Sequence, residues 1–295
     1  MPAEAVHLSA LADSGLPSRD DELVRLSRLG AVLIDLPYFD RFAVGVARYV
    51  LKRPLATSPL GDELHRCSPS RVARSLVERA TALRGNATTR RDGERVLAVG
   101  LGFLSHVAVD ARLHPLVNEL ARVRAQRLGE LPSRQHGEVE KFHSILFHEA
   151  RLGFDFMGDR RIADYITVDG DRVHDGGVVA RAIAAALTSV HGSAPPFSTM
   201  ARWTRGYRHY TQLLASFLGA RIMPEVTKEA VREEVYDGAR FVDHYAEAVQ
   251  RSVAYVQAGL ALADGDAATF ERVVLPGSID EPPHATLRER GLQPF

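Results

Sequence analysis

One apolar segment of the chain carries three metal-ligand side chains at equal spacing. His106, Asp110 and His114 follow one another at intervals of four residues within the sequence GLGFLSHVAVDARLHP. In an α-helix each such interval rotates the side chain by only about 40° and advances it by about 6 Å, so the three would line one stripe. We therefore predict a buried helix over Asp92–Leu113, which ends by His114 because Pro115 fits badly inside a helix.

The carboxylate between the two histidines has a specific chemical use. Two metal ions about 3.5–4 Å apart can share one carboxylate while each histidine binds one of them. We therefore expect Asp110 to bridge two ions. The alternative is that a core histidine, a capping aspartate and a helix-end histidine share this stripe by chance.

A second group of ligand-type residues lies about twenty residues further along the chain. In the sequence HGEVEKFH, His136, Glu140 and His143 fall within about 60° of arc on a helix predicted over 132–152. Zinc sites use histidine nitrogen and carboxylate oxygen atoms, and clusters of zinc ions use both. The full set of candidate ligands is His7, Asp35, His65, His106, Asp110, His114, His136, Glu140 and His143.

The periodicity of the remaining chain predicts an all-α, multi-helix bundle. Residues 1–18 are predicted to be irregular, 39–51 to form a buried helix and 116–128 a short separate helix. A small β-hairpin is expected within 164–174, around an Asp-Gly turn. We divide the chain into a metal-binding helical core, 1–153, and a further helical region, 154–295, that packs on it and ends in an extended tail, 276–295.

Composition limits the function further. The chain has 37 basic and 37 acidic residues, and this balance argues against dedicated nucleic-acid binding. The single cysteine, Cys67, excludes an intrachain disulfide and suits a reducing compartment. The first residues lack the pattern of a signal peptide, and we expect no transmembrane segment. A cytoplasmic location is therefore expected.

The motifs together resemble the zinc-dependent phospholipase C family. The similar stretches are GAVLIDLP, which ends around Asp35, SHVAVDARLHP around Asp110, and HGEVE, which ends at Glu140; they span about the first 150 residues. The resemblance implies two or three zinc ions. One would be held by His106, Asp110, Asp35 and His65, a second by His114, His136 and Glu140, and a third by Asp110 with His7. The family usually has proline before the first-site aspartate, where this chain has Ile34.

The resemblance implies a zinc-dependent phosphodiester hydrolase acting on a phosphodiester or phospholipid-type small substrate. In that case Asp35 is a ligand or the catalytic general base, and Arg112, by its position in the motif, binds the substrate phosphate. Two alternatives stay open. One is a non-catalytic, metal-stabilised helical protein that binds a partner. The other is a di-iron carboxylate protein built on the Glu-x-x-His unit of Glu140 and His143.

Overall fold

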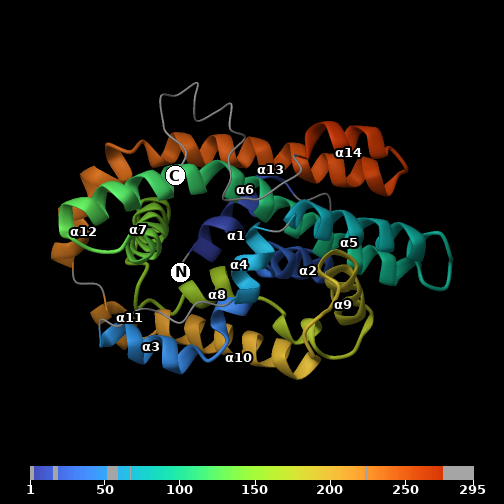
Figure 1. The fold of residues 1–295 in the computed structure, drawn as a ribbon, viewed down its shortest axis with the longest axis horizontal. Coiled ribbons are helices and arrows are strands. Elements are labelled where there is room, and N and C mark those ends of the chain that lie inside the picture. The colour runs from blue at the N-terminus through green and yellow to red at the C-terminus, as the bar shows by residue number, and fades with distance from the viewer. Residues whose placement is uncertain (1–2, 16–18, 52–58, 67, 223–224, 275–295) are drawn as a thin grey trace.

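The computed structural model describes residues 3–15, 19–51, 59–66, 68–222 and 225–274, and these residues form an all-α fold without a β-strand (Figure 1). The α-helices are α1 (Ala3–Asp13), α2 (Asp21–Val32), α3 (Phe42–Val50), α4 (Pro59–Arg66), α5 (Pro69–Arg84), α6 (Arg90–Leu128), α7 (Pro132–Leu152), α8 (Ile162–Ile166), α9 (Val178–His191), α10 (Phe197–Leu214), α11 (Phe217–Ile222), α12 (Glu225–Arg232), α13 (Phe241–Ala263) and α14 (Ala267–Val273). Two 3₁₀ turns, η1 (Leu36–Phe39) and η2 (Gly170–Val173), and a π-helical turn, η3 (Glu233–Asp237), complete the described elements.

The long helix α6 is the centre of the fold, and α2, α5, α7 and α13 pack along it (Figure 1). Two glycines let α2 and α6 cross closely. A Cβ atom at Gly102 would stand 1.9 Å from the carbonyl oxygen of Ser27, and one at Gly30 would stand 2.1 Å from that of Val99. Gly102 therefore permits a close approach of the two helices, and this contact brings the end of α2 against the histidine stripe.

The predicted helix end at His114 is wrong, because α6 continues through Pro115 to Leu128 without a break. A proline has no backbone N–H, so the carbonyl oxygen four residues earlier loses its helical donor. Here that carbonyl belongs to Ala111, and the Arg251 guanidinium of α13 donates to it at 3.3 Å. A side chain from a distant helix thus satisfies the group that the proline leaves without a donor, and residues 116–128 form no separate helix.

The amino-terminal region is helical rather than irregular. Helix α1 is buried on nearly every side, and it contacts α2, α6, α7, α8 and α13 in the interior (Figure 1). A helix enclosed on all sides needs no polar face, so its sequence lacks the amphipathic period by which surface helices are predicted. This placement carries His7 into the core, where its side chain is 3% exposed.

Two further local predictions are wrong. The region of the predicted hairpin, 164–174, forms the end of α8 and the turn η2. Helix α3, predicted to be buried, lies on the surface with Ala43, Val44 and Ala47 exposed. In both places the prediction came from local composition, whereas packing against α10 decided the structure.

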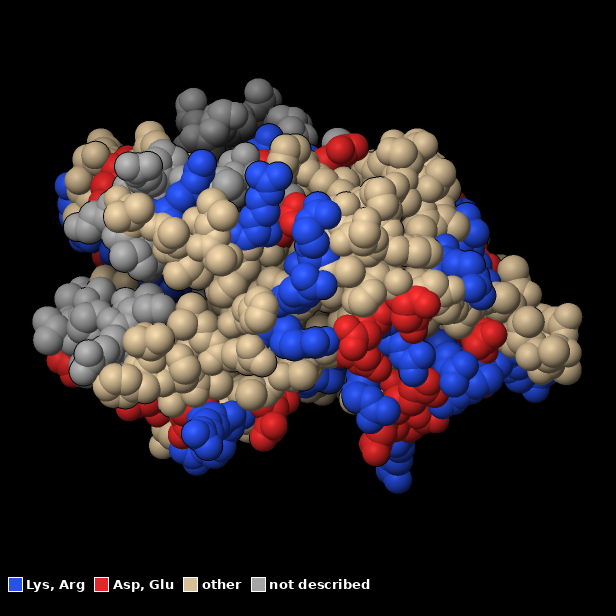
Figure 2. Space-filling model, turned by 90° about the horizontal axis from the view of Figure 1, so that it is seen from below, with Lys and Arg blue, Asp and Glu red and all other residues tan. Residues whose placement is uncertain are grey.

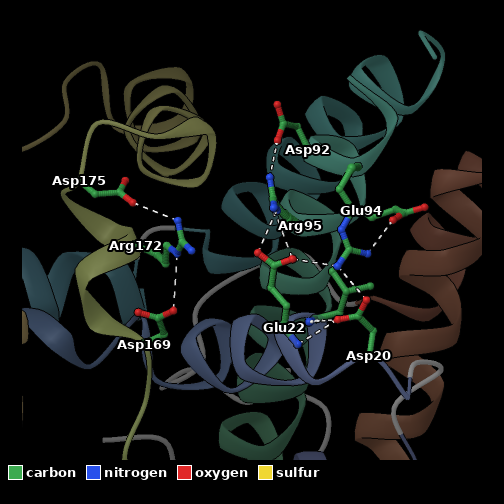
Figure 3. Close-up of polar contacts among 10 residues, drawn as sticks. Asp20, Glu22, Asp92, Glu94, Arg95, Asp169, Arg172 and Asp175 are labelled. Carbon is green, nitrogen blue, oxygen red and sulfur yellow. Dashed lines mark hydrogen bonds and ion pairs between the residues drawn. The ribbon is translucent and has the colours of Figure 1, made fainter. Parts of the chain in front are cut away.

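A polar network fixes the start of α2 against the start of α6 (Figure 3). The Asp20 carboxylate caps α2 by accepting from the backbone N–H groups of Glu22 and Leu23. Glu22 accepts from the Arg95 guanidinium at 3.0 Å, and Asp20 accepts from Arg91 at 2.7 Å. These partly exposed pairs add orientation more than stability.

The most apolar part of α6 is long and apolar enough to cross a membrane by length and composition alone. In the structure 83% of that stretch is buried inside the protein, as befits a core helix. The second half of the chain contributes α10 and α13 to the same apolar core. The predicted tail, 276–295, and Cys67 lie outside the described residues.

Candidate metal centre

Every candidate ligand proposed for the three zinc sites lies in one buried cluster. The residues come from five parts of the fold. They are His7 of α1, Asp35 between α2 and η1, His65 of α4, His106, Asp110 and His114 of α6, and His136 and Glu140 of α7. They form three groups whose ligand atoms lie within 4.8 Å of one another, namely His7–His106–Asp110, Asp35–His65–His106 and His114–His136–Glu140.

Asp110 lies at the middle of this cluster and is 2% exposed. Its Oδ1 atom is 3.1 Å from Nε2 of His7 and 3.3 Å from Nε2 of His114. Its Oδ2 atom is 2.8 Å from Nε2 of His106 and 3.7 Å from Nε2 of His65. Each carboxylate oxygen therefore faces two histidines, an arrangement suited to a carboxylate shared between ions.

Two other carboxylates complete the cluster at its edges. Oδ1 of Asp35 is 3.1 Å from Nε2 of His65. Oε1 of Glu140 is 3.1 Å from Nε2 of His136 and 3.6 Å from Nε2 of His114. Ligand atoms on a tetrahedral zinc with bonds of 2.0–2.2 Å lie roughly 3.3 Å apart. The observed separations lie close to this value, so both edges have dimensions that suit a metal ion.

The other ring nitrogen of three of these histidines is held by an oxygen atom. Nδ1 of His106 donates to the Ala31 carbonyl at 2.7 Å, and Nδ1 of His65 donates to the Gly61 carbonyl at 2.8 Å. Nδ1 of His136 lies 2.9 Å from the side-chain oxygen of Asn118. Such partners fix the tautomer of metal-binding histidines and turn the free Nε2 lone pair toward the ion.

The orientation of His106 bears on whether these residues suit a metal ion. With Nδ1 donating to the Ala31 carbonyl, Nε2 of His106 stands 2.8 Å from Oδ2 of Asp110 without a hydrogen bond between the two atoms. Both atoms are buried, and neither has a hydrogen-bond partner; Nδ1 of His7 is also unsatisfied. A buried acceptor without a partner is costly. A shared cation or proton removes that cost, so the residues fit a metal ion.

The charges of the cluster favour ionised carboxylates. Burial acts to raise the pKa of Asp110, but the neighbouring His106, His114 and His7 outweigh it and hold that pKa well below its usual range. The pKa of Glu140 is likewise lowered despite burial, chiefly by His136. For His65, burial acts to lower the pKa, but the contact with Asp35 raises it to about 9, so an ion that binds there displaces the Nε2 proton. Ligand carboxylates are therefore available at neutral pH.

A narrow cavity of about 20 Å³ adjoins the cluster. It is lined by His7, Asp110, His114 and Glu140 together with apolar residues and His143. This volume accommodates about one water molecule. The most exposed of the ligand side chains is His136, at 27%, so solvent reaches the cluster from the α7 side.

Two predicted features lie elsewhere. Arg112 is two residues from Asp110, which places it on the opposite side of α6, and its guanidinium pairs with Glu247 of α13 at 2.6 Å. His143 donates through Nε2 to the Val235 carbonyl and stacks on Phe241, so it supports η3 and is absent from the three ligand groups. Among the described residues of the second half, no histidine enters those groups.

Glu4 is a functional candidate that the sequence did not indicate. It is 2% exposed, and burial, followed by the charge of Asp35, raises its pKa to about 8. The Tyr210 hydroxyl donates to it at 3.3 Å. In the sequence, Glu4 is recognisable only as a carboxylate on a largely apolar segment. That observation becomes informative once α1 is known to be buried.

No family model, curated protein or solved structure matches this chain. The resemblance to zinc-dependent phospholipases C thus stays a prediction carried by three short motifs, whereas the all-α fold and the clustering of the ligand-type residues are observed.

Proposed function

We propose that this protein is a zinc-dependent phosphodiester hydrolase of the phospholipase C type. The observation that carries the proposal is the repeated orientation of the histidines. His65, His106 and His136 each have Nδ1 against an oxygen atom and Nε2 against a carboxylate. In a neutral core histidine the second ring nitrogen accepts from a donor, whereas here it faces a carboxylate acceptor, so three such arrangements around shared carboxylates favour metal binding over packing.

The contacts support a division of the ligands around Asp110. Its Oδ2 faces His106 and His65, and these two with Asp35 would hold one ion. Its Oδ1 faces His114, which with His136 and Glu140 would hold a second ion. His7 also faces Oδ1 and would contribute to a third. A histidine Nε2 binds one ion, so His106 serves only one of the two groups that include it.

Zinc ions bound there would supply an acidified water nucleophile and neutralise charge on the phosphate oxygens. The chain itself contributes the ligand geometry and a largely buried site. Burial would raise the pKa of Asp35, but His106 and His65 outweigh it and keep that pKa below its usual value. A carboxylate of lowered pKa is a weak base, and this favours Asp35 as a ligand over its alternative role as general base.

One observation favours a second candidate function, a metal-stabilised protein without catalytic activity. The cavity beside the cluster holds about 20 Å³, which is too small for a phosphodiester. Catalysis would therefore need movement near α7, where His136 is partly exposed. The di-iron alternative has less support, because His143 bonds to Val235 rather than joining Glu140 as a ligand.

The test measures metal content and turnover on the same preparation. Protein grown with zinc should contain two or three zinc equivalents, and it should hydrolyse bis(p-nitrophenyl) phosphate in a reaction that chelator stops and zinc restores. Glu140→Gln should lose activity. Glu138→Gln is the matched control on α7, because Glu138 pairs with Lys141 at 2.6 Å and belongs to no ligand group. Full zinc content without turnover would favour the non-catalytic function, and less than one equivalent would refute both.

A further inference from the structure

Helices α3, α10 and α11 form the lower face of the molecule in Figure 1, and they combine basic residues with exposed apolar side chains. Helices α3, α10 and α11 contain five arginines and no acidic residue, in a chain whose net charge is zero. Viewed from below, Figure 2 has basic side chains running between broad areas without charge. Charge is therefore unevenly distributed, and these three helices carry a local excess of positive charge.

Large apolar side chains stand exposed on the same helices. Phe217 and Leu218 of α11 are 67% and 63% exposed, and Val44 of α3 is 48% exposed. Both α3 and α11 pack on α10, and the Phe42 and Tyr210 rings, 6.1 Å apart, join α3 to the end of α10 nearest α11. The exposed apolar groups thus belong to one continuous set of packed helices.

The arginines lie on the outer side of α10. Arg202, Arg205 and Arg208 recur every three residues and are all exposed. Arg202 pairs with Asp40 at 3.0 Å and Arg208 with Asp171 at 2.9 Å. Arg205 makes no ion pair with any described residue, so its charge remains available to a partner.

We propose that the outer surface of α3, α10 and α11 docks on an anionic lipid bilayer. Basic side chains attract acidic headgroups, and neighbouring aromatic and aliphatic groups enter the boundary between headgroups and acyl chains. A nucleic acid would match the charge but would gain little from Leu218 and Val44, so the apolar part of the surface favours lipid.

The docking surface lies close to the metal cluster along the chain. Asp35 is followed by the four residues of η1, and after two more residues by α3, whose first residue is Phe42. Gly206 of α10 packs directly on the backbone of Phe39 in η1, where a Cβ atom would stand 2.0 Å from its carbonyl oxygen. Docking would therefore bring a surface rich in phosphodiesters beside the elements that hold Asp35. The proposal does not depend on hydrolysis, because attachment is measured separately.

Sedimentation of the full-length protein with vesicles tests the docking surface. Vesicles of phosphatidylcholine with about one third phosphatidylglycerol should bind the protein, and pure phosphatidylcholine should bind it at least tenfold more weakly. Arg205→Gln should lower the partition coefficient about fivefold, the value of one surface charge near an anionic membrane. The double variant Phe217→Ser with Leu218→Ser should lower it more than tenfold.

Two matched controls lie on other helices. Arg71→Gln removes an exposed charge from α5, and Val242→Ser removes an apolar side chain that is 52% exposed on α13. Neither should change vesicle binding, and circular dichroism should be native for every variant. Three outcomes would overturn the proposal. The protein could bind neither kind of vesicle, or the control variants could lose as much binding as the test variants. The third outcome is that an equimolar DNA duplex binds the same arginines and displaces the protein from anionic vesicles. Turnover on a soluble diester without vesicle binding would leave the phosphodiesterase proposal intact.

Discussion

Asp110→Asn is the substitution that separates a shared metal ligand from a packed core carboxylate. The change keeps nearly the same shape but removes the negative charge and one of the two oxygen atoms. Each oxygen of Asp110 faces two histidines, so the loss reaches both proposed sites. Glu140 faces His136 and His114 and belongs to their ligand group, so Glu140→Gln should affect mainly the second site.

The expected size follows from linkage between metal binding and folding. At a free zinc concentration one hundred times Kd, each ion stabilises the folded chain by about 2.7 kcal/mol. Even outer partners of metal ligands change affinity by 10–100-fold, so losing a direct ligand should weaken a site at least about 100-fold. Each affected ion then contributes only about 0.4 kcal/mol, a loss of about 2.3 kcal/mol per site.

The two variants should therefore differ in a simple ratio. For the first and second sites alone, Asp110→Asn should lose about 4.6 kcal/mol and Glu140→Gln about 2.3 kcal/mol, or roughly 10 °C and 5 °C in Tm for a chain of this size. The assay is differential scanning fluorimetry with zinc and with chelator, beside zinc content by elemental analysis. In the presence of chelator, the difference in Tm between wild type and Asp110→Asn should shrink or reverse, because the asparagine amide can donate a hydrogen bond to a histidine nitrogen.

Two outcomes would refute the shared-ligand reasoning. Full zinc content in Asp110→Asn is one. The other is a Tm loss that is the same with zinc and with chelator, since this would mean that Asp110 stabilises the metal-free core. The alternative of a capping aspartate is wrong, because Asp110 lies in the middle of α6 rather than at a helix end.

Two other predictions concern residues outside the cluster. Pro115→Ala should raise the free energy of unfolding, because the new N–H donates to the Ala111 carbonyl that Arg251 now satisfies. Arg251→Gln should therefore lower the free energy of unfolding less in the Pro115→Ala background than in wild type. Additive effects of the two substitutions in urea unfolding would contradict this prediction. Burial lowers the pKa of His148 from 6.5 to about 4, so the unfolded chain takes up a proton between these values and stability is lost as pH falls through this window. From pH 7 to pH 5, wild type should therefore lose about 1–2 kcal/mol more than His148→Gln, while the variant of an exposed histidine, His209→Gln, should follow wild type.

The sequence alone was enough to predict the fold class and the centre of the site. The interval of four residues between His106, Asp110 and His114 is a property of any straight helix, and so is the interval between His136 and Glu140. Both stripes needed only local helical geometry to be correct, and α6 and α7 place them face to face. Predictions of this kind succeed because each side chain's direction is set by its own helix.

The remaining features depended on contacts between distant segments. Pro115 stays inside α6 because Arg251, far along the chain, donates to the carbonyl that a local rule counts as unsatisfied. Surface exposure of α3 followed from packing on α10, although its composition is that of a core helix.

The tertiary structure also decided which isolated residues join the cluster. His7 reaches Asp110 because α1 is enclosed on nearly every side, and such a helix has no broad polar face to reveal it in the sequence. His65 reaches Asp35 from α4, and Gly61 holds its other nitrogen. Sequence spacing sets which way a side chain points along one helix, but only packing between helices sets what stands opposite it.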